Sequence, residues 1–120
     1  NELAFVPVDY SPDGAVDEWS GDRGCGANYF SQQAVARLIP VAGIEMPDIP
    51  EDALPERLKQ VQALMADGDE RARKIYQTIG RYFGYAVPHF CEYYAPVRHI
   101  EVLGRVMTGE GGQIILSEAR

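Results

Sequence analysis

Apolar residues recur every three or four positions between residues 69 and 90, and this is the clearest pattern in the chain. The spacing predicts a long amphipathic helix whose apolar face carries Ala72, Ile75, Ile79, Phe83, Val87 and Phe90. Asp69 is expected to cap this helix, and Pro88 to kink it or loosen one turn, because proline has no backbone N–H. Gly80 and Gly84 lie four residues apart on one side of the helix and predict close packing against another element.

Two shorter helices are predicted before the long one. The first begins near Asn28 or Ser31, either of which can act as the N-cap, and it is stopped by Pro40. The second begins near Pro55, since proline is favoured in the first turn of a helix, and it ends at Asp67. The apolar face of the second helix consists of Leu54, Leu58, Val61 and Met65.

The two ends of the chain are expected to contain strands. Residues 3–8 are apolar, and Pro7 places them at a sheet edge because proline cannot donate a hydrogen bond to a neighbouring strand. Residues 99–103 are predicted to form a buried strand, followed by a glycine-containing turn over residues 104–112 and a helix over residues 113–119. A strand, a turn and a helix in this order form half of an α/β unit.

Composition limits the classes of protein that fit the chain. Its 120 residues suit a single domain, and a hydrophobic content of 46% is sufficient for a core. The net charge of −7 repels phosphate groups, which disfavours binding to nucleic acid or to anionic lipid. No apolar run approaches the roughly 20 residues that span a bilayer. Cys25 and Cys91 are too few for a disulfide framework and indicate free thiols in the cytoplasm.

Residues 2–31 contain a recognisable order of motifs. The segment begins with Glu2-Leu-Ala-Phe, continues with a hydrophobic stretch, and then carries Gly21, Gly24 and Cys25 shortly before a helix. In this order the segment resembles the ROK family of bacterial sugar kinases and sugar-responsive repressors. The resemblance implies that Glu2 is a sugar-binding residue.

The same segment departs from the family at the positions that hold a metal ion. Where the family has a histidine and two cysteines, this chain has Phe5, Glu18 and Ser20. Only Cys25 matches a ligand, and a structural zinc site needs about four nitrogen or sulfur ligands, so no zinc is expected. The last glutamate of the motif, which the family directs to the sugar, is replaced by Ala27.

Residues 68–116 resemble the same family in a second way. They show a Gly-Asp pair, a helix with a Gly-x-x-x-Gly pattern, an apolar segment and a glycine-rich turn. In the family, glycines after the apolar strand approach the adenosine of ATP, where a side chain would block the approach. Gly104 holds the first of these positions, and Arg105 and Val106 replace the next two glycines. The resemblance therefore implies that Gly104 and Arg105 lie near a bound nucleotide.

The resemblance implies a fold and the limits of the chain. The expected fold is α/β, a helix-rich carboxy-terminal fragment of an actin-like ATPase (ribonuclease H-like) lobe with about four helices and a few strands. Residues 1–120 would form one fragment of that lobe, and the family's phosphate loops and catalytic aspartate would lie before Asn1. The fragment alone is accordingly expected to be inactive.

Two functions stay open for the longer protein. The resemblance implies a sugar kinase that binds a sugar, ATP and magnesium between two lobes, although the altered motifs leave open whether catalysis survives. The alternative is a non-catalytic sugar-sensing or protein-interaction domain of a regulator. In either case a second copy of the fragment is expected to cover its exposed apolar surface or strand edges, which would make a homodimer.

The remaining polar and aromatic residues point to structural roles. The carboxylates between residues 9 and 22 do not follow the spacing of an EF-hand, so a solvated acidic loop is favoured over a calcium site. His89 and His99 show no sequence partner that would hold a catalytic tautomer. The aromatic residues between 82 and 94 lack the interleaved basic residues of a nucleic-acid surface and are assigned to a core and an interface.

Overall fold

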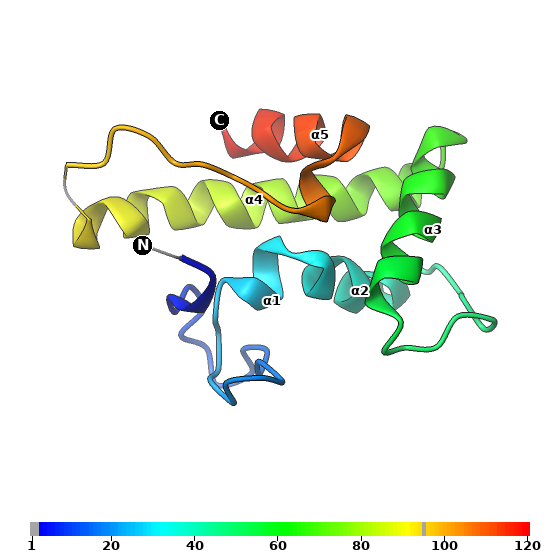
Figure 1. Ribbon diagram of the computed structural model, residues 1–120, viewed down its shortest axis with the longest axis horizontal. Coiled ribbons are helices and arrows are strands. Elements are labelled where there is room, and N and C mark those ends of the chain that lie inside the picture. The colour runs from blue at the N-terminus through cyan, green and yellow to red at the C-terminus, as the bar shows by residue number, and fades with distance from the viewer. Residues whose placement is uncertain (1–2, 95) are drawn as a thin grey trace.

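The longest helix of the computed structural model follows the apolar pattern of residues 69–90. This helix is α4 (Glu70–Tyr93), which runs along most of the molecule in Figure 1. Asp69 caps it as predicted, because its carboxylate accepts a hydrogen bond from the backbone N–H of Arg71 at 2.9 Å. Pro88 lies inside α4, and the helix continues beyond it to Tyr93.

The other helices are shorter and pack against α4, with α5 on one side of it and α1 and α2 on the other (Figure 1). Within the residues that the structure describes, 3–94 and 96–120, they are α1 (Ala27–Phe30), α2 (Gln32–Val41), α3 (Leu54–Ala66) and α5 (Gly109–Ala119). Two 3-10 helices, η1 (Leu3–Phe5) and η2 (Arg105–Met107), precede α1 and α5. None of these helices has the length and apolar character needed to cross a membrane.

The first predicted helix is divided into α1 and α2 at Ser31. The Ser31 hydroxyl oxygen accepts a hydrogen bond from the backbone N–H of Gln33 at 3.1 Å, which confirms Ser31 as an N-cap. The prediction that Pro40 stops this helix is wrong, because α2 includes Pro40 and ends at Val41. A proline this close to the end removes only one hydrogen bond from the helix, and the helix tolerates that loss.

The boundaries of α3 match the prediction, whereas those of α5 do not. Pro55 stands in the first turn of α3, and Asp67 is its C-cap. The helix predicted over residues 113–119 begins earlier, at Gly109, inside the predicted turn.

One hydrophobic core joins α2, α3, α4 and α5. Its buried residues are Ala34, Val35, Ile39, Ile44, Met46, Leu58, Val61, Met65, Ala72, Ile75, Tyr76, Ile79, Val106, Ile114 and Ile115. Three of the six residues on the predicted apolar face of α4 belong to this set, which confirms the face from which that helix packs.

The predicted α/β fold, a lobe of an actin-like ATPase with a few strands, is wrong. The described part of the chain is helical and contains no β-strand. Its only β-type pairings are two isolated bridges, Pro7–Cys25 and Val16–Arg23. Residues 3–8, predicted as an edge strand, form η1 and one of these bridges. The backbone of Val6 and Val8 pairs with Gly26 and Gly24 through hydrogen bonds of 3.0 and 2.8 Å, but the pairing extends over one bridge only and does not form a strand.

Helices α4 and α5 pack with their backbones in contact. A Cβ atom added to Gly80 would lie 2.7 Å from the carbonyl oxygen of Ile115, and one added to Gly84 would lie 3.0 Å from the Cα of Ala119. The two glycines therefore allow the close approach that their spacing predicts. Moving four residues along α4, from Gly80 to Gly84, also moves the contact four residues along α5, from Ile115 to Ala119. The two helices therefore run in the same direction.

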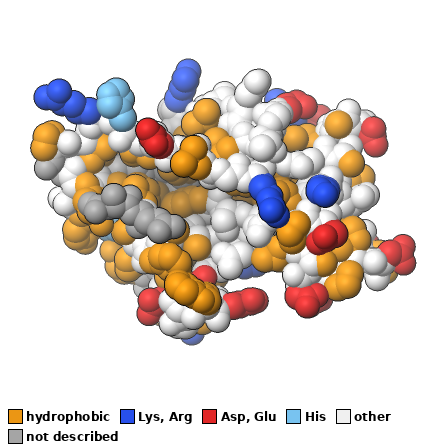
Figure 2. All heavy atoms as spheres, viewed as in Figure 1, with side chains coloured by type: hydrophobic (Ala, Val, Ile, Leu, Met, Phe, Trp, Pro, Cys, Tyr) orange, Lys and Arg blue, Asp and Glu red, His pale blue; other side chains and the backbone are white. Residues whose placement is uncertain are grey.

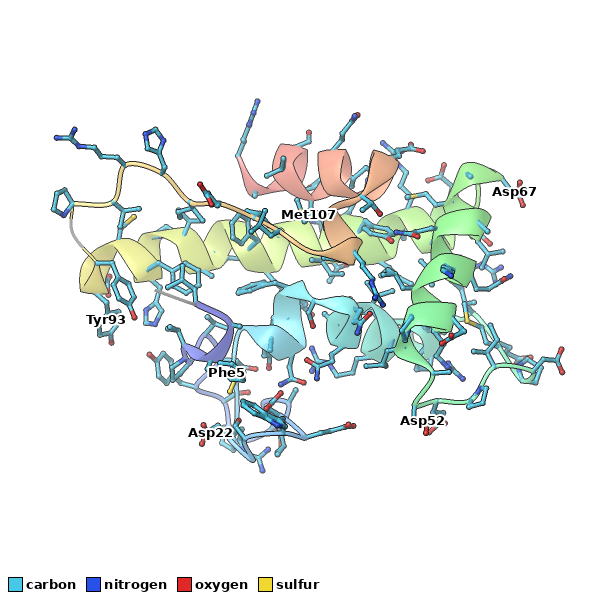
Figure 3. All side chains as sticks on the ribbon, in the orientation of Figure 1. Phe5, Asp22, Asp52, Asp67, Tyr93 and Met107 are labelled. Carbon is cyan, nitrogen blue, oxygen red and sulfur yellow. The ribbon has the colours of Figure 1, made fainter. Side chains whose placement is uncertain are left out.

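The parallel arrangement explains the course of the residues predicted as a second strand. After Tyr93 the chain must return to the level of Tyr76, whose ring contacts the start of α5. At the rise of an α-helix, the distance along α4 from Tyr93 back to Tyr76 is about 26 Å. Residues 96–108 cover much of this distance. Tyr93 and Met107 mark its two ends (Figure 3). Residues 99–103 are drawn out along α4 without secondary structure (Figure 1), so the prediction of a buried strand there is wrong.

Replacing Gly80 with alanine tests the contact between α4 and α5. In a helix interior this change normally stabilises by up to about 1 kcal/mol. Here the added Cβ must displace the backbone at Ile115, and overpacking costs about 1–3 kcal/mol. We expect Gly80→Ala to lower the free energy of unfolding in urea by about 1–2 kcal/mol. Lys74→Ala, at an exposed position of α4, should change it by less than about 0.5 kcal/mol. A more stable Gly80→Ala variant would contradict the contact.

The cap of α4 makes stability depend on pH. The hydrogen bond from the Arg71 side chain is the largest of several contacts that lower the pKa of Asp69 from 3.8 to about 2. Because the folded pKa is lowered, the stabilisation is complete above pH 3.8 and is lost as the pH falls toward 2. We expect the thermal midpoint of the wild type to fall more steeply in this interval than that of Asp69→Asn. Circular dichroism melts measure both midpoints, and parallel curves would contradict the role of this carboxylate.

Candidate functional site

Residues 97–103, called the strap below, form one wall of a large cavity. The strap makes no backbone–backbone hydrogen bond to any other part of the chain that the structure describes. Ile100 and Val102 are half-buried, whereas His99 and Glu101 are exposed. The strap is therefore held by some of its side chains, and no backbone group of residues 3–94 or 96–120 outside the strap pairs with its N–H and C=O groups.

The cavity, called the groove below, has a volume of about 1110 Å³ and lies between the strap, α1 and α4. Phe30, Phe83 and Phe90 form its aromatic floor. The ring of Phe30 meets that of Phe83 at 5.7 Å and 80°, and that of Phe90 at 6.3 Å and 83°. These are favourable edge-to-face arrangements. On the face drawn in Figure 2, hydrophobic side chains gather in a hollow left of the centre.

Polar groups line the rim of the groove and one part of its interior. Three charged side chains and one histidine lie at the rim, namely Arg98, His99, Glu101 and Arg105. Gln32 also lines the groove, and its Oε1 atom is buried without a hydrogen-bond partner among the described residues. Such an unpaired acceptor costs about 1–3 kcal/mol, so a bound molecule with a hydrogen-bond donor would be stabilised at this point.

The structure brings two of the three predicted binding residues to the groove. Gly104 and Arg105, predicted to lie near a nucleotide, both line it at the end of the strap. The carbonyl oxygen of Arg105 accepts a hydrogen bond from the hydroxyl of Thr108 at 2.8 Å, which holds the turn into α5. Glu2, the predicted sugar-binding residue, lies outside the described residues.

A pair of side chains that sequence reasoning missed organises the loop between η1 and α1. The Tyr29 hydroxyl donates a hydrogen bond to the carboxylate of Asp9 and accepts one from the backbone N–H of Ala15 at 3.2 Å. The hydrogen bond from Tyr29, followed by those from Ser11, lowers the pKa of Asp9. Burial, followed by the hydrogen bond to Asp9, raises the pKa of Tyr29.

Asp17 is a buried anchor of the same loop. Only 2% of it is exposed, and it accepts hydrogen bonds from the backbone N–H of Ser20 at 2.7 Å and the amide of Asn28 at 3.4 Å. The hydrogen bond from the Ser20 backbone is the largest cause of its lowered pKa. The predicted solvated acidic loop is therefore wrong at Asp17. The Asp-x-x-Ser spacing is the sequence signal for such a side-chain-to-backbone contact.

His89 joins two parts of the chain, and both cysteines are free thiols, as predicted. The Nε2 atom of His89 lies 3.1 Å from the hydroxyl of Tyr10 and 3.1 Å from the carbonyl oxygen of Pro7, so it ties the N-terminal segment to α4. Cys25 is buried and free, and Cys91 is exposed and free. In the described part of the chain, no three His, Cys, Asp or Glu side chains come together in a way that could hold a metal ion.

No family model, no curated protein and no solved structure matches this chain. The ROK resemblance therefore stays a prediction. A function has to be argued from the geometry of the groove, the strap and the loop.

Removing the Tyr29 hydroxyl tests the polar pair in the loop. We expect Tyr29→Phe to raise the pKa of Asp9 toward 3.8, because the Tyr29 hydrogen bond is the largest cause of its lowering. The free energy of unfolding should fall by about 1–2 kcal/mol, since two part-buried hydrogen bonds are lost. Carboxyl NMR titration and urea denaturation measure these quantities. Tyr85→Phe, which removes a hydroxyl from an exposed tyrosine on α4, should change neither. An unchanged Asp9 pKa in Tyr29→Phe would contradict the pairing.

Proposed function

We propose that this chain is a non-catalytic protein-interaction domain whose strap pairs with an extended segment of a partner chain. The observation that carries the proposal is the backbone of residues 97–103, which has no backbone–backbone hydrogen bond within the described chain. An extended segment with free N–H and C=O groups is a template for another strand. Addition of a strand to such an edge is a recurring mode of protein recognition.

The residues of the strap suit strand pairing. Residues 97–103 contain no proline, so every residue can donate a hydrogen bond from its backbone N–H. Val97, Ile100 and Val102 are β-branched, a type that is enriched in strands. The half-buried Ile100 and Val102 alternate with the exposed His99, Glu101 and Leu103. This alternation leaves one face of the strap on the protein and the other in solvent.

The partner that the strap fits is a second copy of the chain. When two straps pair antiparallel about a two-fold axis at Ile100, His99 of each copy lies opposite Glu101 of the other. The two Ile100 side chains then meet, and Val97 lies opposite Leu103. An axis at Glu101 would instead place two carboxylates opposite each other, which is destabilising. The charges of the strap thus favour one register over its neighbour.

The charge of the strap supports the same pairing. The strap has a formal charge of zero, from Arg98 and Glu101, whereas the whole chain carries −7. Pairing through the strap therefore brings neutral segments together and keeps the acidic surfaces apart. The free thiols of Cys25 and Cys91 are typical of a reducing compartment, so we place this function in the cytoplasm.

A second candidate function is the sugar and ATP binding that the ROK resemblance implies. One observation favours it: Gly104 and Arg105 line a groove whose floor is three phenylalanine rings. An adenine ring can stack on such a floor, and a guanidinium group can bind phosphate. Titration with Mg-ATP followed by NMR tests it. Saturable shifts at Gly104 and Arg105 would favour this candidate, and their absence would reject it.

Sedimentation across micromolar to millimolar concentrations tests the strap pairing. We expect a concentration-dependent dimer that Glu101→Lys weakens, because lysine would face His99 of the other copy. Two cross-strand pairs at about 0.2–1 kcal/mol each correspond to a rise of about 2- to 30-fold in Kd. Ile100→Pro, which removes a backbone donor at the axis, should abolish the dimer.

The matched control is Glu45→Lys, which makes the same change of charge at an exposed position outside the strap. It should retain the wild-type Kd. The proposal would be rejected by a wild-type chain that stays monomeric at millimolar concentration. A Glu45→Lys variant that weakens the dimer as much as Glu101→Lys would also reject it.

A further inference from the structure

A second, smaller cavity lies between the N-terminal segment and α4. Its volume is about 260 Å³, and its lining includes Asp9, His89 and the rings of Tyr29, Tyr82 and Tyr85. Pockets for drug-sized ligands measure roughly 300–1,000 Å³, so this cavity suits a small molecule or the end of a larger one.

The walls of this cavity are aromatic. The rings of Tyr29 and Tyr82 meet edge to face, with centroids 5.4 Å apart and planes at 82°. Tyr85 is 83% exposed, so its ring stands at the mouth of the cavity and is not needed for the core. The faces of aromatic rings carry partial negative charge and attract cations.

A cation of the protein already lies on one of these rings. The guanidinium carbon of Arg37 is 4.7 Å from the centroid of the Tyr29 ring. Arg37 is fixed there by a hydrogen bond of 2.8 Å to the carbonyl oxygen of Asn28. It is not part of the cavity lining, so it shows the affinity of this ring for a cation without filling the cavity.

Asp9 supplies the cavity with a negative charge. Its Oδ1 atom accepts a hydrogen bond from the backbone N–H of Ser11 at 2.9 Å, and its Oδ2 atom accepts one from Tyr29. These hydrogen bonds lower its pKa, so the carboxylate is ionised at neutral pH. His89 also lines the cavity, with its Nε2 atom 3.1 Å from both the Tyr10 hydroxyl and the Pro7 carbonyl oxygen, and the positive charge of Arg37 is close enough to contribute to the lowered pKa of Asp9. The net charge of −7 adds a general attraction for cations.

From this geometry we infer that the cavity binds a small organic cation, and that a quaternary ammonium group is the chemistry it fits. Aromatic rings together with a carboxylate can bind a methylated ammonium without requiring directed hydrogen bonds. A neutral sugar of similar size would depend on such hydrogen bonds, and the protein already uses one acceptor position on each oxygen of Asp9. The inference does not rest on the proposed function, because no residue of the strap lines this cavity.

The test is an NMR titration of the full chain with choline at constant ionic strength. The matched control ligand is 3,3-dimethylbutan-1-ol, which has the shape of choline without its charge. We expect saturable shifts of the amides of Asp9, Tyr29 and Tyr82 with choline and none with the alcohol. Tyr85→Ala should weaken choline binding by about two- to fivefold, the effect of one exposed cation–π contact.

Asp9→Asn separates charge from shape, because the amide oxygen can still accept the hydrogen bond from Tyr29. It should weaken choline binding more than Tyr85→Ala does. Trp19→Ala removes another exposed aromatic residue, one outside the cavity lining, and should leave binding unchanged. Three results would each overturn the inference: no saturable shift with choline, equal binding of the alcohol, or undiminished binding by a folded Asp9→Asn variant.

Discussion

The backbone contact between α4 and α5 is the constraint on which the rest of the structure depends. Gly80 and Gly84 let α5 lie against α4, and the order of the contacts makes the two helices parallel. Consecutive parallel helices must be joined by a crossover that retraces the first one. The strap is that crossover, so helix packing rather than a sheet imposes its drawn-out course. A segment with the composition of a strand is thereby left beside an aromatic groove, with no backbone hydrogen bond to the rest of the described chain.

The groove follows from the same geometry. The crossover runs along α4 as a single segment without secondary structure, so no second layer of helix or sheet packs onto α4 there. Side chains such as those of Ile100 and Val102 reach inward only in part, and they remain half-buried. The floor of Phe30, Phe83 and Phe90 is consequently covered by a strap instead of by a packed layer, and a cavity remains between them.

The features that could be predicted from the sequence are those that depend on the residues of one segment alone. The periodicity of α4, the cap at Asp69 and the close approach at Gly80 are local properties, and the structure has all three. The prediction of a strand over residues 99–103 was wrong, because a strand also depends on a neighbouring strand, which the composition of the segment does not reveal. The same limit applies to the sites. Asp9 and Tyr29 are separated by 20 residues, and no spacing rule joins them.

The two cavities are connected through α1. This helix has four residues, too few to be stable alone, so side-chain contacts determine its position. Tyr29 packs against Tyr82 in the small cavity, and Phe30 packs against Phe83 in the floor of the groove. Phe30 also lines both cavities. The groove and the small cavity therefore share one wall, the ring of Phe30.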